Sequence, residues 1–244
     1  MSRNVDVLTE IERERENGSA GVRARASAGQ FDGHRTPPVG AVRKPAMLRL
    51  VRNIFLTNTA NAPHKVAFIG VDDDNGSSSV CVNVGRALAE LTGKPVCLVD
   101  GNVDSARLSQ MFAGEKMVPF SDKLGTACGQ CVQVSGNLWL AGPAILSDSR
   151  GSLLPHDELL DVLAQLSRAF DYVLMDASGT HVSSDAESLG SVADAAVLVI
   201  DAHKTRRAAT AEAKERLDMA GVRLLGTVLN NRTFPIPEKL FRLL

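Results

Sequence analysis

The chain has 244 residues, of which 44% are hydrophobic and 23% are charged, and its formal net charge is -1. A chain of this length can bury a core that needs neither disulfides nor a metal, and it fits one good-sized domain with or without a tail. The near-neutral charge gives no basic excess to neutralise phosphates, and the low aromatic content of 4% argues against a base-stacking surface. We therefore expect no nucleic-acid partner.

Residues 1–45 differ in composition from the rest of the chain. Val5 to Glu16 is rich in Glu and Arg, and Asn17 to Pro45 consists largely of Gly, Ser, Ala, Arg and Pro without periodicity. Such a segment buries too little apolar surface to offset the entropy of ordering it. The prediction is a flexible N-terminal tail over 1–45 and one folded domain over 46–244. The chain shows neither an apolar signal segment nor a bilayer-length apolar run, so we expect a cytoplasmic protein.

From residue 46 onward, apolar runs alternate with segments of helical spacing. The pattern predicts helices over 46–55, 80–91, 106–112, 157–170, 186–192 and 208–220, and strands over 65–71, 95–100, 137–141, 171–176, 195–201 and 224–230. Continuous apolar strands that alternate with helices indicate an α/β fold, a doubly wound and mostly parallel sheet with helices on both faces. Ligands of such sheets bind at the carboxyl ends of the strands, here the loops after Val71, Asp100 and Asp176.

The loop after the first strand has the layout of a phosphate-binding P-loop, whose signature is G-x-x-x-x-G-K-[ST]. Gly76 holds the second glycine position, Ser77 stands where the lysine belongs, and Ser78 holds the hydroxyl position that ligates magnesium. Ser79 follows in the same helical turn. Helix N-terminal N–H groups in such a loop hold phosphate. The alternative is a simple strand-to-helix turn with its corner at Asn75 and Gly76.

The substitutions in this loop change its charge. A serine at position 77 supplies no positive charge for the β and γ phosphates. Asp72, Asp73 and Asp74 add negative charge to the same loop. Like charges at about 4 Å repel by a few kcal/mol at an effective dielectric near 20, so tight ATP binding is disfavoured twice.

Two acidic residues end apolar strands at the same predicted edge of the sheet. Asp100 ends the second predicted strand and Asp176 ends the fourth. Together with the Ser78 hydroxyl they form a candidate magnesium site beside a nucleotide. We therefore name Asp100 and Asp176 as candidate catalytic residues. The alternative is that the two strand ends simply meet solvent.

From about Met47 to Asn231, the chain resembles the cytoplasmic kinase domain of the bacterial tyrosine kinases of capsule and exopolysaccharide assembly, within the MinD/ParA-like P-loop NTPases. Beyond the loop, the matching stretches are Val96–Asp104 (second Walker-type motif), Ala141–Pro143, Phe170–Asp176 (Walker B strand), Ser184–Asp185, Val192–Arg207 and Gly226–Asn230. The chain departs from the family at Asn102 and Asp104, which replace an aspartate and an arginine, and at residues 177–179, which replace T-P-P.

The resemblance implies a P-loop NTPase-like fold with ATP and Mg2+ as cofactors. It implies nucleotide contacts from Gly76, Ser77, Ser78, Ser79 and Asn230, the last near adenine, and magnesium ligation by Ser78, Asp100 and Asp176. It also implies a membrane-bound polysaccharide chain-length or export protein as partner, recruitment to the inner face of the membrane, and homo-oligomerisation. The family's tyrosine-rich C-terminal tail is missing, because Tyr172 is the chain's single tyrosine and lies in a predicted strand.

Two other groups of residues were weighed as sites. Cys128 and Cys131 form a C-x-x-C pair, but zinc needs two further ligands and a redox pair needs a helix start after a strand. Lys204, Arg206 and Arg207 form a basic cluster that either supplies phosphate charge or is a solvated helix start. The apolar segment from Phe234 to Leu244 docks either on its own domain or on a partner.

The sequence leaves three alternative functions open. The first is a degenerate tyrosine kinase or ATPase that regulates or scaffolds capsular or exopolysaccharide biosynthesis and export. The second is a working ATP-dependent tyrosine kinase or ATPase with a non-standard P-loop, in which a basic residue from elsewhere replaces the lysine. The third is a MinD/ParA-like positioning ATPase on membrane or DNA, against which the absence of a basic face and an amphipathic membrane helix counts.

Overall fold

The computed structural model describes residues 44–57, 61–103, 105–115, 117–120, 127–177, 179 and 184–231. Most of the predicted tail and the apolar segment from Phe234 to Leu244 lie outside these residues. The first helix, α1 (Lys44–Val51), starts two residues before the predicted boundary and continues as a short π-helix, η2 (Arg52–Leu56). The division into a tail over 1–45 and a domain over 46–244 stays a prediction.

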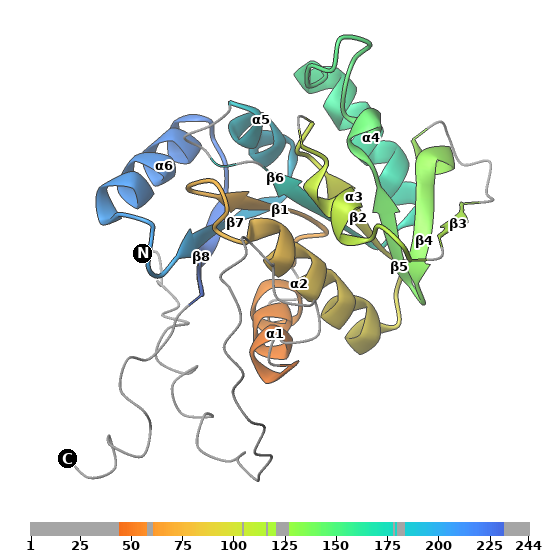
Figure 1. The fold of residues 1–244 in the computed structure, drawn as a ribbon, viewed down its shortest axis with the longest axis horizontal. Coiled ribbons are helices and arrows are strands. Elements are labelled where there is room, and N and C mark those ends of the chain that lie inside the picture. The colour runs from red at the N-terminus through yellow and green to blue at the C-terminus, as the bar shows by residue number, and fades with distance from the viewer. Residues whose placement is uncertain are drawn as a thin grey trace, which may run out of the picture.

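An eight-stranded sheet in the order β3-β4-β5-β2-β6-β1-β7-β8 forms the centre of the molecule (Figure 1). The five neighbouring pairs from β5 to β8 are all parallel. The strands are β1 (Lys65–Gly70), β2 (Val96–Asp100), β3 (Val118–Pro119), β4 (Cys131–Ser135), β5 (Leu138–Ala141), β6 (Tyr172–Ala177), β7 (Ala195–Asp201) and β8 (Leu224–Asn230). The α/β, doubly wound and mostly parallel architecture is thereby confirmed.

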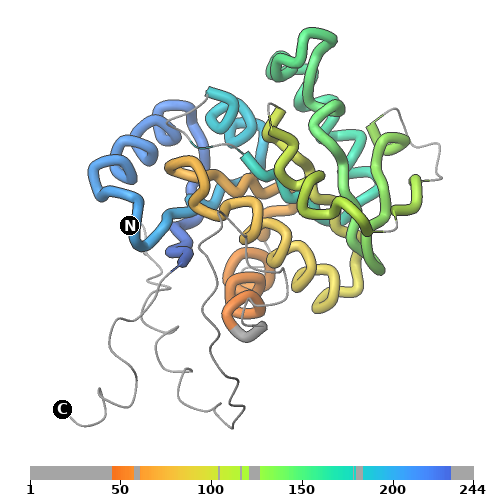
Figure 2. Tube along the Cα trace, viewed as in Figure 1, coloured from red at the N-terminus to blue at the C-terminus, as the bar shows by residue number. Residues whose placement is uncertain are grey.

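Helices cover both faces of this sheet, and each face has its own apolar core. One core joins the sheet to α4 (His156–Ala169), α5 (Asp185–Val192) and α6 (Arg207–Met219). The other joins it to α1, α2 (Ser77–Thr92) and α3 (Arg107–Met111), with α1 packed on α2 (Figure 2). The central strands are buried on both faces because they carry continuous apolar runs, as in β1 and β6.

The antiparallel edge of the sheet was not predicted from the sequence. Strands β3 and β4 pair antiparallel with each other, and β4 pairs antiparallel with β5 through a turn at Gly136, which adopts φ 47. In β4 the side chains of Cys131 and Val134 are buried and those of Val132 and Gln133 are partly exposed, so the strand lacks strict alternation, and its register with β5 shifts between Gln133 and Ser135. Aromatic side chains of Phe120, Trp139 and Phe170 pack together at this edge. Short 3-10 helices, η4 (Cys128–Gln130) and η5 (Pro143–Ile145), flank it.

The fold brings the loops that follow β1, β2, β6, β7 and β8 to one edge of the sheet, because these strands run parallel. This edge therefore collects the residues that the sequence singled out after Val71, Asp100 and Asp176. Among the described residues, no helix has the length and apolarity that a bilayer span requires.

Candidate functional site

The loop between β1 and α2 is organised around the side chain of Asn75. This side chain is only 2% exposed, and its amide lies directly against Gly70, where an added Cβ would collide with it. Its Nδ2 donates a hydrogen bond to the Val199 carbonyl of β7 (3.0 Å), and its Oδ1 accepts one from the Ser77 N–H (3.0 Å). One of the helix N-terminal donors with which a P-loop holds phosphate is thus already bound within the protein.

The end of β8 closes the loop from the other side. Asn230 Nδ2 donates to the Asn75 carbonyl (2.9 Å) and lies so close to Gly76 that a Cβ there would collide with it. Gly76 adopts φ 83, a left-handed conformation that glycine takes without steric cost. Asn230 therefore contacts the phosphate-loop backbone in this structure. Its predicted place near adenine stays a prediction.

Asp176 lies at the end of β6 beneath the start of α2, and only 1% of it is exposed. Its Oδ1 atom has no hydrogen-bond partner among the described residues. Burial raises the pKa of this carboxyl to about 7, while the approach of the Ser78 and Ser77 hydroxyls acts to lower it. The structure thus places Ser77 and Ser78 beside Asp176, and the predicted roles of these residues in holding nucleotide and magnesium stay predictions. Ser79 lies in the same turn, and its carbonyl accepts a hydrogen bond from the Asn83 amide (2.7 Å).

Asp100 is the register partner of Asp176 on the adjacent parallel strand. It is fully buried, and burial raises the pKa of its carboxyl. Hydrogen bonds act to lower that pKa: Oδ2 accepts from the Ser109 N–H (3.0 Å) and hydroxyl (3.1 Å), and Oδ1 accepts from the Asn102 N–H (3.3 Å). Asp100 is therefore oriented by the loop and helix that follow it, whereas Asp176 keeps a free oxygen.

Arg107, which the sequence analysis did not single out, lies across the acidic loop. Its guanidinium forms ion pairs with Asp74 (Nη1 to Oδ1, 3.0 Å) and Asp73 (Nη2 to Oδ1, 3.6 Å). It also acts electrostatically on Asp176, whose pKa it helps to lower. The expectation that all three loop aspartates simply repel phosphate is therefore incomplete, because two of them have a positive partner. Three consecutive aspartates in a structured loop need such a counter-charge, and this was the signal that could have pointed to it.

The residues fit the two halves of a magnesium nucleotide unequally. For the metal half, the unpaired Asp176 oxygen, Asp100 and the Ser78 hydroxyl are oxygen groups of the kind that Mg2+ prefers, and their role as ligands stays a prediction. Two carboxylates are not a complete site, and within the described part of the chain no cluster of three or more His, Cys, Asp or Glu residues could hold a metal. The phosphate half does not fit, because Ser77 carries no charge and its N–H is taken by Asn75.

The other candidates lie elsewhere. Cys128 and Cys131 are completely buried in the core with free thiols, which accords with packing rather than metal binding among the described residues. Lys204, Arg206 and Arg207 are exposed around the start of α6, as expected for a solvated helix start. Tyr172 is buried as predicted, with its ring edge-on to Phe55 and stacked on His64.

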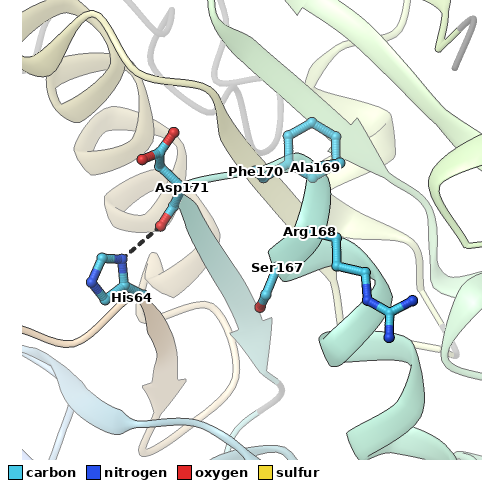
Figure 3. Close-up of a pocket in the computed structure, with 6 residues that line it drawn as sticks. All are labelled: His64, Ser167, Arg168, Ala169, Phe170 and Asp171. Carbon is cyan, nitrogen blue, oxygen red and sulfur yellow. Dashed lines mark hydrogen bonds between the residues drawn. The ribbon is translucent and has the colours of Figure 1, made fainter. Parts of the chain in front are cut away.

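A surface hollow of about 390 Å³ lies at the opposite edge of the sheet (Figure 3). It is formed by the end of α4 and the residues just before β1 and β6, and is lined by His64, Ser167, Arg168, Ala169, Phe170 and Asp171. His64 Nδ1 lies 2.8 Å from the Asp171 carbonyl oxygen, so this contact ties two loops together. None of the predicted site residues lines the hollow, and the carboxyl edge of the sheet remains the candidate site.

Comparison with curated proteins finds similarity to bacterial tyrosine kinases. The chain is 27% identical over 186 residues to the tyrosine-protein kinase CpsD of Streptococcus pneumoniae, covering 73% of this chain and 82% of that protein. It is 29% identical over 163 residues to the tyrosine-protein kinase YwqD of Bacillus subtilis, covering 64% of this chain and 68% of that protein. No protein-family model matches the chain.

Solved structures show the same fold. The kinase domain of Escherichia coli tyrosine kinase ETK aligns with a TM-score of 0.61 and 18% identity, over 86% of this chain and 88% of that one. The chimerical protein CapA2B2 aligns with a TM-score of 0.64 and 17% identity, over 78% and 85%. The septum site-determining protein MinD of Pyrococcus horikoshii, solved with Mg-ADP, aligns with a TM-score of 0.56 and 22% identity, over 72% and 75%.

Proposed function

Because this chain is a member of the bacterial tyrosine kinase family within the MinD/ParA-like P-loop NTPases, we propose that it is a degenerate member that regulates or scaffolds capsular or exopolysaccharide export without transferring phosphate. Its partner would be a membrane-bound chain-length or export protein, which would recruit the chain to the inner face of the membrane. The partner and the location follow from the similarity to the bacterial tyrosine kinases.

One observation carries the proposal: the Asn75 amide binds the Ser77 N–H from beneath the loop. A P-loop stabilises phosphate with two devices, its N–H groups and its lysine. Here the lysine position is Ser77, and the N–H of that same residue has an internal acceptor. Asn75 is also bonded to Val199 and held by Asn230, so the loop has its own hydrogen-bond partners without a ligand.

The buried tyrosine supports the same conclusion. The sequence contains a single tyrosine, Tyr172. Tyr172 is 6% exposed and packed between Phe55 and His64, so its hydroxyl is not presented to a second molecule as an acceptor. Phosphorylation of one copy by another would require β6 to leave the centre of the sheet.

The second candidate is a working ATPase or kinase with a non-standard loop. It is favoured by the retained ligand set of Ser78, Asp100 and Asp176, and in particular by the unpaired oxygen of Asp176. In that case the chain's own residues would orient the metal, and a basic group outside the loop would neutralise the phosphates. The fold likeness to MinD does not by itself favour a positioning function, because low identity carries the fold alone.

The experiment is a turnover assay on the full chain with Mg-ATP, beside an Asp176→Asn variant. Phosphate release and phosphotyrosine are measured together, with and without the purified cytoplasmic part of the export partner. The proposal predicts no turnover above the Asp176→Asn background and partner binding of equal strength with and without ATP. Turnover that Asp176→Asn abolishes would establish the second candidate instead.

A further inference from the structure

Arg107 is the basic side chain that the structure places at the phosphate edge. It begins α3, directly after the loop that follows Asp100 and carries Asn102. Its guanidinium reaches Asp73 and Asp74 of the phosphate loop, and its charge also acts on Asp176. A positive group that faces both the loop and the buried metal-type carboxylate occupies the electrostatic position that a P-loop lysine normally serves.

The backbone on both sides of the contact between Arg107 and the loop aspartates has an unusual conformation. Asp74 adopts φ 58 and Ala106, just before Arg107, adopts φ 44, both in the left-handed region that non-glycine residues rarely occupy. The chain therefore holds unfavourable backbone at both ends of this ion pair. Strained positions persist only where the surroundings hold them, and here the surroundings include the Asp73–Arg107–Asp74 contact.

We propose that Arg107 is the cation that binds phosphate at this site, and that the Asp73 and Asp74 carboxylates compete with phosphate for its guanidinium. The ligand class is a polyphosphate anion, as in the tail of a nucleoside di- or triphosphate. In the protein as it stands, two carboxylate oxygens occupy the guanidinium in the manner of phosphate oxygens. This rests on the proposed function, since it names how the same site is kept from binding nucleotide.

Exposure sets the size of the effect. The side chain of Arg107 is 36% exposed, and those of Asp73 and Asp74 are 57% and 69% exposed. Ion pairs this open are weak, so removing the Asp73 and Asp74 carboxylates should have only a modest effect on the affinity of Arg107 for a polyphosphate. Removing both carboxylates should strengthen anion binding by about tenfold, the effect of one or two such contacts.

The loop provides a matched control in Asp72. It carries the same charge in the same loop, but among the described contacts it forms no ion pair with Arg107. If the acidic loop acted only through its overall charge, Asp72→Asn, which removes one charge, would give about half the gain in binding free energy of the Asp73→Asn/Asp74→Asn variant, which removes two. If the carboxylates compete for the guanidinium, Asp72→Asn has a much smaller effect.

The test titrates the full chain with sodium tripolyphosphate and with ADP by calorimetry at low salt. Five proteins are compared: wild type, Asp72→Asn, Asp73→Asn/Asp74→Asn, Arg107→Gln, and the triple variant Asp73→Asn/Asp74→Asn/Arg107→Gln. Asparagine keeps the side-chain size and tolerates the left-handed conformation of residue 74. Thermal melting checks that each variant is folded.

The expected result is a gain of about tenfold for the double variant over wild type, lost again in the triple variant and absent from Asp72→Asn. An unchanged affinity of the double variant, a gain that survives without Arg107, or a gain in binding free energy from Asp72→Asn of about half the double variant's or more overturns the proposal. Wild-type turnover would refute the degenerate function but would not alter this comparison. Conversely, if the double variant gains no affinity for the anion, the Arg107 proposal fails while the result of the turnover assay still stands. The failure of the Arg107 proposal and the failure of the proposed function are therefore distinguishable.

Discussion

Asp100 and Asp176 are direct register partners at the carboxyl ends of β2 and β6, so two buried carboxyl groups stand on neighbouring strands. Burial raises the pKa of both, and the Asp100 charge raises the pKa of Asp176 further. Such a pair is unfavourable in the folded state when both groups are ionised. A bound proton or cation relieves this repulsion. Proton binding by the Asp100–Asp176 pair can therefore be measured through the pH dependence of stability.

The first prediction concerns pH. The pKa of Asp176 rises from 3.8 to about 7 on folding, so the native state holds a proton between these values that the unfolded chain has released. Stability therefore falls as pH rises through this window, by at most about 4 kcal/mol, and the full penalty is present above it. An Asp176→Asn variant should be more stable than wild type at pH 8, and its free energy of unfolding should change less across this pH window. Urea unfolding with a chelator present measures both.

Asp194 provides a control of opposite sign. Burial acts to raise its pKa, but the N–H groups of Lys65 and His64 and the Lys65 ammonium outweigh this and lower it. Its contribution to stability is therefore present above the unfolded pKa and is lost as pH falls. Asp194→Asn should destabilise the protein at neutral pH. Superimposable pH profiles for wild type and Asp176→Asn would contradict the assignment of Asp176.

The second prediction separates backbone strain from contact at Gly76. Gly76→Ala introduces a Cβ at φ 83 that collides with Asn230, whereas Gly93→Ala introduces one at φ 66 with nothing within 4 Å. The Gly93 variant should lose about 1 kcal/mol from left-handed strain alone. The Gly76 variant should lose about 1 kcal/mol more, because the Asn230 hydrogen bond to Asn75 is displaced. Equal losses, measured by thermal unfolding, would show that Asn230 does not hold the loop.

The third prediction concerns Asn75. Replacing it by alanine leaves the Ser77 N–H without its acceptor and removes a buried bond to Val199, so we expect a loss of about 1–3 kcal/mol in unfolding free energy. Hydrogen exchange should accelerate at residues 71–77. Asn83→Ala is the matched control, since it removes one amide bond to Ser79 within α2 and introduces a better helix former. Comparable losses in both variants would argue against a special role for Asn75.

Much of the fold was predictable because the central strands and helices carry clear periodicity. The apolar runs of β1 and β6 and the spacing in α2 gave their positions within a few residues. The edge strands β3 and β4 were missed, since β3 has two residues and β4 is a five-residue segment that begins at the second cysteine of the pair and lacks strict alternation of buried and exposed residues. Short edge strands depend on tertiary pairing more than on local pattern.

The site was predictable only in part. Strand ends located Asp100 and Asp176, and the loop layout located Gly76, Ser77 and Ser78. The sequence named Asn75 only as the corner of a turn and did not single out Arg107, because their roles come from contacts between elements far apart in sequence: Asn75 with Val199 and Asn230, and Arg107 with Asp73 and Asp74. A side chain's partner across a sheet edge cannot be deduced from spacing along one segment.

The fourth prediction concerns phosphotyrosine. Tyr172 is buried at the centre of the sheet, so incubation of the pure chain with Mg-ATP should yield no phosphotyrosine by mass spectrometry. Incubation with an active kinase of the same family should leave Tyr172 equally unmodified in the folded protein. Modification only after thermal unfolding would agree with burial as the cause. Efficient modification of the native chain would show that β6 is accessible and that this part of the account is wrong.

The most direct test of the central claim is calorimetric titration with Mg-ATP of the wild-type chain beside a Ser77→Lys variant. The variant restores the charge that the phosphate half of the site lacks, while Ser78, Asp100 and Asp176 stay in place for the metal. A degenerate phosphate loop predicts no measurable binding by wild type and measurable binding by the variant. Micromolar binding by wild type, with no gain from the lysine, would contradict it and show that the loop holds nucleotide as it stands.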